Sequence, residues 1–124
     1  MAVMQSRDNR TFIAGEDLSA AQFKFVTLEA DGQVDLADAA GENAIGVCLA
    51  GAAAGAAVTV CVSGSVMVEA GGVIAAGAKV QTGADGTALT AAAGDVVLGY
   101  AREAGVDGQI IEIEMIQGGN VVPA

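Results

Sequence analysis

The uncharged stretch Ala44–Val68 fits two different structures. Its 25 residues are long enough to cross a bilayer, and Gly51 and Gly55 have the small-xxx-small spacing of paired membrane helices. Near its end, however, three valines alternate with small or polar residues: Val58, Val60 and Val62. A period of two is typical of a half-buried strand.

A second copy of this pattern lies 53 residues further along the chain and favours the strand. Ile45-Gly46-Val47 recurs as Leu98-Gly99-Tyr100. The three valines are also matched by apolar residues: Ile111, Ile113 and Met115. Glu112 and Glu114 stand between them, and such alternation indicates a strand with one wet face. Because carboxylates are costly to insert into a bilayer, we predict a strand–loop–strand unit in each copy and no membrane span.

The repeat extends over most of the chain. Ala30-Asp31-Gly32 recurs as Ala84-Asp85-Gly86, at an offset of 54 instead of 53. The halves 21–62 and 75–115 are therefore expected to be two copies of one unit that differ by a one-residue insertion or deletion. Strands are expected at Phe23–Leu28, Gln33–Leu36, Ile45–Leu49, Val58–Val62, Lys79–Thr82, Val96–Ala101 and Gln109–Ile116. Five glycines are expected to be structural, at turns and bends: Gly32, Gly46, Gly64, Gly86 and Gly99.

Short strands, glycine-rich turns and two related halves predict an all-β fold, a compact sandwich or barrel. We expect one β domain over residues 15–116, preceded by an extended N-terminal arm (1–14) and followed by a short flexible tail (117–124). Met1–Arg10 has no useful strand or helix period, so it is expected either to be disordered or to order against a partner. The candidate partner-binding residues are the two arginines of the arm and the apolar patch after them: Arg7, Arg10, Thr11, Phe12 and Ile13.

Composition limits which side chains can form the core and which classes of partner are expected. Aromatic residues make up 3% of the 124 residues and Trp is absent, so the core must be aliphatic and thin, and small cores of this kind often rely on oligomerisation. The net charge of −10 repels nucleic acid and anionic lipid, and neither is expected as a partner. Met1–Phe12 lacks the apolar segment of a signal peptide, which favours assembly in the cytoplasm and reduced thiols.

Few residues offer catalytic or metal-binding chemistry. The chain has no His, the commonest general base and metal ligand, and its serines lack a nucleophile context. Glu112 and Glu114 would lie about 7 Å apart on one strand face, where a solvated edge is favoured over half a calcium site. Cys48 and Cys61 would be side by side if they pair across a hairpin, and free thiols are favoured over a disulfide. We predict no catalytic, cofactor or metal site.

An ordered set of motifs resembles the capsid decoration, or cement, proteins of tailed bacteriophages. The resemblance covers about residues 15–116, although the usual proline of the central loop is replaced where Ala52-Ala53-Ala54 stands. The motifs are Glu16–Val26, Asp31-Gly32, Ile45-Gly46-Val47, Gly55, Val58–Gly64, Ala75–Val80, Asp85-Gly86-Thr87 and Leu98-Gly99-Tyr100. The resemblance implies a non-enzymatic, β-rich domain on the outside of the icosahedral shell, commonly a trimer at three-fold and quasi-three-fold positions.

We therefore expect a structural virion protein whose partners are the major capsid protein and itself, as a homotrimer. Its expected place is the outer surface of the capsid, where it would stabilise the expanded shell by clamping neighbouring capsid subunits. A ligand that binds one lattice state stabilises that state, and a trimer adds avidity. The alternative is a small β binding module of another virion part, a tail or a fibre. An enzyme fragment or assembly chaperone ranks third.

Overall fold

The computed structural model of the protein describes the backbone of residues 5–115 and the side chains of residues 9–115. This part of the chain contains strands and no helix, so it has no helix that could span a membrane, and the all-β prediction is confirmed. The strands are β1 (Gln5–Ile13), β2 (Phe25–Leu28), β3 (Val34–Leu36), β4 (Gly46–Cys48), β5 (Ala57–Glu69), β6 (Lys79–Thr82), β7 (Ala88–Thr90), β8 (Gly99–Ala101) and β9 (Ile110–Met115).

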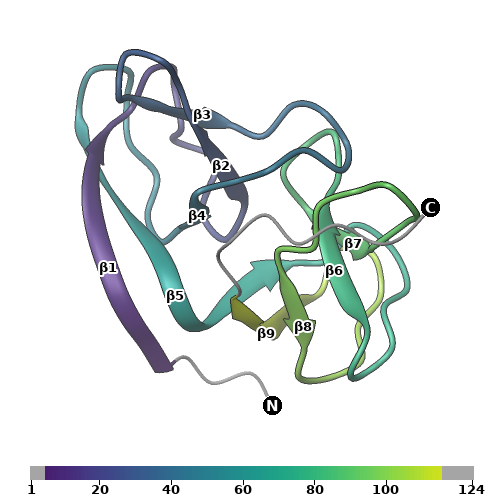
Figure 1. Ribbon diagram of the computed structural model, residues 1–124. Helices are drawn as coiled ribbons and strands as arrows, with labels where there is room; N and C mark the ends of the chain where they lie inside the picture. The colour runs from purple at the N-terminus through teal and green to yellow at the C-terminus, as the bar shows by residue number, and fades with distance from the viewer. Residues whose placement is uncertain (1–4, 116–124) are drawn as a thin grey trace.

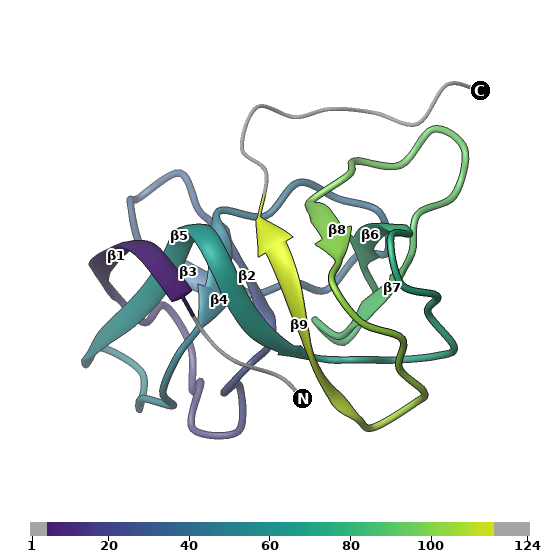
Figure 2. The same cartoon turned by 90° about the horizontal axis from the view of Figure 1, so that it is seen from below.

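All strands belong to one curled antiparallel sheet that forms a half-barrel (Figure 1). Its order is β3-β2-β4-β5-β9-β8-β6-β7, and β1 pairs with β5 in addition. β1 lies along one edge of β5, while β4 and then β9 pair along the opposite edge. Between these two partners β5 bends sharply (Figure 2). Gly64, one of the glycines expected at turns and bends, begins the part that pairs with β9 and has a φ of 89°. The bend therefore lets one strand serve both halves of the molecule.

The sequence repeat is also a repeat of strand register. Val26 pairs with Leu36 in the β2–β3 hairpin, and Val80 pairs with Thr90 in the β6–β7 hairpin, 54 residues later. Cys48 faces Val60 between β4 and β5, and the pair of Ala101 and Ile113 between β8 and β9 follows it at an offset of 53. Asp-Gly turns close both hairpins, since an Asp side chain and a glycine with positive φ suit a tight turn. The two related halves are thus confirmed.

The repeat includes β1, which sequence alone did not show. Phe12 of β1 pairs with Val58, and Val68 in the second part of β5 pairs with Ile111 in the same way. The bridges from Ala14 to Val34 and from Ala70 to Ala88 continue the match. β5 is therefore the last strand of one unit and the first strand of the next. We call residues 5–62 unit 1 and residues 63–115 unit 2.

Two sequence-based expectations are corrected here. Residues 5–10 were expected to lack regular structure, but they belong to β1. These residues are polar and show no period, so the sequence did not reveal a strand. They form one because β1 obtains its hydrogen bonds from β5, with register shifts near Asp8. The short strand β7 was also missed, since its three residues are too few to show a period. The predicted C-terminal tail, 117–124, lies outside the described residues.

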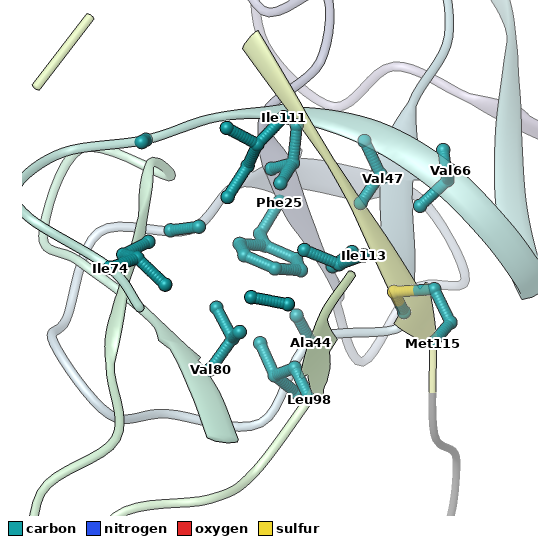
Figure 3. Close-up of a cluster of buried hydrophobic side chains, with 14 of the residues drawn as sticks. Phe25, Ala44, Val47, Val66, Ile74, Val80, Leu98, Ile111, Ile113 and Met115 are labelled. Carbon is teal, nitrogen blue, oxygen red and sulfur yellow. The ribbon is translucent and has the colours of Figure 1, made fainter. Parts of the chain in front are cut away.

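Two buried clusters lie on opposite faces of unit 1. We call the first the unit 1 core; its fully buried members are Ala14, Leu18, Ala21, Val26, Val34, Cys48, Val58 and Val60. The second, the shared core, is drawn from both units around Phe25 (Figure 3). Adjacent residues of β2, of β4 and of β5 enter different clusters, as Phe25 and Val26 do. Both faces of unit 1 are therefore apolar.

The two units are stacked in tandem and not face to face. Val26 of the unit 1 core corresponds by register to Val80, which lies in the shared core. The shared core is thus the equivalent core of unit 2, covered by the reverse face of unit 1. That reverse face supplies Phe25, Val47 and Cys61 to the shared core. The reverse face of unit 2 carries Lys79, Tyr100 and Glu114 at these positions, and all three are exposed.

The two cysteines lie on opposite faces of the sheet. Cys48 pairs with Val60 and Cys61 pairs with Val47, so the register is one residue away from the one that would place the thiols side by side. Neither thiol forms a disulfide and both are buried, and burial raises the pKa of Cys48. The prediction of thiols without a disulfide is correct, and neither cysteine has exposed surface.

Candidate interaction surfaces

β1 presents most of the predicted partner-binding residues. Arg10 and Thr11 are exposed, Ile13 is 42% exposed, and Phe12 is half-buried against the unit 1 core. Arg7 belongs to the backbone of β1, and its side chain lies outside the described ones. Within residues 5–115, β1 pairs only with β5, so its second edge is available to another strand.

The five predicted structural glycines serve different geometric needs. Gly32, Gly64 and Gly86 have φ between 81° and 89°, a region that favours glycine. Gly46 and Gly99 lie within β4 and β8 instead of in turns. A Cβ atom at either would overlap the carbonyl oxygen of the neighbouring strand, from Cys61 or Glu114. These glycines therefore shape the sheet in both units.

The carboxylates of β9 do not form a solvated edge. β9 lies between β5 and β8 in the sheet, and Glu112 is buried. Arg102 donates to Glu112 Oε2 at 2.9 Å and approaches Glu114 Oε1 at 3.9 Å. The solvated-edge expectation is wrong for Glu112, because the guanidinium compensates its charge. No group of residues that could hold a metal ion occurs in the described part of the chain.

Carboxylates concentrate at the free end of unit 1. Burial raises the pKa of Asp35, and neighbouring acidic side chains raise it further: Glu16, Glu29, Asp31 and Asp38. One oxygen of Asp35, Oδ1, is buried without a hydrogen-bond partner. Asp35 lies on β3, at one end of the sheet, where charge discourages pairing with another strand.

A pocket of about 430 Å³ adjoins this acidic end of unit 1. Its lining comes from the end of β2 and from the segment before β4: Thr27, Leu28, Glu29, Glu42, Asn43, Ala44 and Ile45. Leu28 is 50% exposed there. Burial raises the pKa of Glu42, and the nearby Asp38 raises it further. Sequence reasoning missed the pocket because its lining residues come from two segments that only the fold brings together.

Two valines form an apolar tip at the opposite end of unit 2. Val73 is 80% exposed and Val106 is 56% exposed. They flank the bridge between Ile74 and Gly105, which places them on adjacent segments. Single valines in glycine-rich loops carry no periodic signal, so the sequence did not reveal this tip.

Comparison with known proteins agrees with the fold. The N base of head fiber gp8.5 of bacteriophage phi29 is similar in structure, with a TM-score of 0.70 and 21% sequence identity over 91% of this chain and 97% of that chain. No curated protein matches the sequence. The profile of a family described as phage cement protein matches residues 4–114, which is most of the chain and includes both units. The chain therefore belongs to the phage cement protein family.

Proposed function

We propose that this protein decorates the outer surface of an icosahedral tailed-phage capsid and stabilises the expanded shell by clamping neighbouring major capsid subunits. Membership of the phage cement protein family implies a capsid-associated, structural and non-enzymatic role. The location on the outer surface, the clamping of capsid subunits and the assembly into a homotrimer go beyond that role, and these are what we propose. In this proposal the protein acts by binding alone, and it stabilises the state of the capsid lattice that it binds more tightly.

The observation that carries the proposal is the available edge of β1. Within residues 5–115, the second edge of this nine-residue strand pairs with no other strand, so an extended capsid segment can add to it by main-chain hydrogen bonds. Arg10 and Thr11 are exposed beside that edge, and Ile13 adds apolar surface. Arg7 and Arg10 are cations in a chain of net charge −10, so they suit an acidic capsid surface. We therefore propose that the predicted partner-binding residues, Arg7, Arg10, Thr11, Phe12 and Ile13, contact the capsid.

The first test adds the purified protein back to heads from which it has been stripped. Undecorated expanded heads should release DNA at a lower temperature than decorated heads, and adding the protein should restore the higher temperature. Equal stability of both kinds of head, or equal binding to unexpanded proheads, would refute the clamp.

The second test asks whether β1 makes the contact. Thr11→Glu and Ala104→Glu each add one carboxylate at an exposed position, the first on β1 and the second in the loop after β8. Thr11→Glu should weaken binding to heads by about tenfold, whereas Ala104→Glu should bind like the original protein. If both variants bind equally well, β1 is not the capsid contact. Circular dichroism of the two variants confirms that each remains folded.

The alternative function is a binding module of another virion part, a tail or a fibre. The structural likeness to a head fiber base shows a common fold, and that protein is part of a phage head fiber. Copy number separates the two functions, because a decoration protein covers the whole shell in hundreds of copies and a fibre or tail module occurs a few times per particle. Quantitative gel analysis of purified particles measures this ratio.

A further inference from the structure

The contact between the two units suggests how one copy of the chain meets another. Backbone hydrogen bonds join unit 1 to unit 2, and three of them lie at the β6–β7 turn and around Gly41. Phe25 N donates to Gly86 O at 2.8 Å, Gly41 N donates to Thr82 O at 2.9 Å, and Val96 N donates to Gly41 O at 3.1 Å. Gly41 is buried in this contact, with a φ of 79°. A side chain there would overlap the carboxylate of Asp95, so only glycine fits.

In unit 2, Gly41 of unit 1 packs against a site next to Thr82 and Val96. The pocket of unit 1 is the equivalent site in unit 1. Thr82 and Val96, the two partners of Gly41, correspond by strand register to Leu28 and Asn43, which both line the pocket. Thr82 is completely buried under the Gly41 loop, whereas Leu28 is 50% exposed. The pocket is thus a docking site that the chain fills in unit 2 and leaves open in unit 1.

The chain also carries a second copy of the inserted loop. Gly94 is the equivalent of Gly41, with a φ of 84°, and nothing lies within 4 Å of its Cβ position. The following residue closes the same turn in both loops: Glu42 N donates to Ala39 O, and Asp95 N donates to Ala92 O. The loop of residues 91–95 therefore has the shape of the loop that docks within the chain, but it is exposed.

Charge at the rim agrees with such a contact. Lys24 lies near the β6–β7 turn, where it contributes to lowering the pKa of Asp85. By strand register Ala78 is the equivalent of Lys24, and Lys79 is the equivalent of Phe25, whose N donates to Gly86 O directly after Asp85. In the equivalent contact between two copies, Lys79 of one copy would therefore lie near Asp31 in the β2–β3 turn of the other. Lys79 is exposed and Asp31 is exposed. Since Lys79 and Tyr100 replace Phe25 and Val47, the repeated contact is confined to the loop and its rim.

We propose that the pocket of unit 1 binds the 91–95 loop of a second copy of this chain. The contact is head-to-tail, so each copy offers a pocket to one neighbour and a loop to the other. Such contacts close into a ring when the rotation between copies allows it, and a ring of three would be the proposed homotrimer. The inference deepens the self-association part of the proposed function, and it is measured on the purified protein without capsids.

The first experiment compares two glycine variants by light scattering after size-exclusion chromatography. Gly94→Ala and Gly108→Ala impose the same backbone strain, since both glycines are exposed with φ of 84° and 85° and no atom within 4 Å of the Cβ position. Only the Cβ at residue 94 would meet the Glu42 carboxylate of a second copy. Gly94→Ala should raise the dissociation constant about tenfold or more, while Gly108→Ala should assemble like the original protein.

The second experiment tests the head-to-tail geometry. Leu28→Lys blocks the pocket and leaves the loop intact, whereas Gly94→Ala blocks the loop and leaves the pocket intact. At a protein concentration above the dissociation constant of the original contact but below the raised constants of the variants, each variant alone should be monomeric, and an equal mixture should form a one-to-one dimer that grows no further. A mixture that stays monomeric, or a single variant that still assembles, would overturn the proposal.

A charge exchange gives a third readout. Lys79→Asp and Asp31→Lys should each weaken assembly. The double variant should restore it, because residues 79 and 31 then again carry opposite charges across every contact. Failure of the double variant to exceed either single variant would contradict the proposed rim. An original protein that is monomeric up to its solubility limit, with Leu28→Lys impaired in binding heads, would also overturn the proposal and assign the pocket to a capsid segment.

Discussion

Unit 1 and unit 2 have the same strand registers but differ in what lies against their reverse faces. The reverse face of unit 1 carries Phe25, Val47 and Cys61 and is buried against unit 2. The reverse face of unit 2 carries Lys79 and Tyr100 at matching positions and faces solvent. The two units share the same strand pairing, and a few side chains decide which reverse face is covered by another unit. The two units are therefore interchangeable in hydrogen bonding and distinct in packing.

The strongest test of this difference substitutes alanine at two equivalent positions. Phe25 lies at the centre of the shared core with no exposed surface, so Phe25→Ala should lower the free energy of unfolding by about 3–5 kcal/mol. Lys79→Ala should change it by less than about 0.5 kcal/mol because the side chain is exposed. Urea denaturation of both variants measures the two values. Similar losses at both positions would contradict the assignment of buried and exposed reverse faces.

A second test transfers a side-chain pair from unit 1 to unit 2. Arg102 and Glu112 occupy the positions that Leu49 and Thr59 hold in unit 1, as their equivalent backbone hydrogen bonds show. Arg102→Leu alone should cost about 1–3 kcal/mol, because it leaves the buried carboxylate of Glu112 without its cation.

Adding Glu112→Thr to that variant removes the buried charge and restores the apolar–polar pair of unit 1. The double variant should therefore recover most of the lost free energy of unfolding, measured by the same denaturation. No recovery would mean that unit 2 depends on the ion pair for a reason other than compensation of the Glu112 charge.

The smallest expected effects distinguish two aspartates by pH. The pKa of Asp35 is raised by burial and by neighbouring carboxylates, so its favourable contribution is present at low pH and is lost as pH rises through the folded-state pKa. Asp35→Asn should thus raise the melting temperature at pH 7, with the gain disappearing in acid.

Asp85 is the matched control with the opposite sign. Hydrogen bonds from Thr87 lower the pKa of Asp85, so its contribution is present at pH 7 and is lost as pH falls through the folded-state pKa. Asp85→Asn should lower the melting temperature at pH 7. Both effects should stay below about 1 kcal/mol, because Asp85 is exposed and Asp35 is only partly buried, so solvent screens both groups. Melting curves between pH 3 and pH 7 that shift in the same direction for both variants would contradict this account.

The sequence by itself determined the class of fold, the repeat and the family. Period-two alternation identified most strands, and an offset of 53–54 residues located equivalent strands and turns, because register and turn chemistry are local properties of the chain. The ordered motifs indicated a phage cement protein, in agreement with the family match. Gly32, Gly64 and Gly86 were also recognisable as positions with special backbone geometry.

Only the tertiary structure decided how the repeats meet. β1 is polar and without a period, and it is a strand because β5 offers it hydrogen bonds. The apolar residues Phe25 and Val26 are adjacent, and alternation cannot say which of two apolar faces receives the second unit. Glu112 is buried because Arg102 reaches it from the neighbouring loop, a pairing that strand pattern does not encode. The pocket beside Leu28 is open because no other segment of residues 5–115 covers it, whereas the Gly41 loop of unit 1 covers the equivalent place in unit 2.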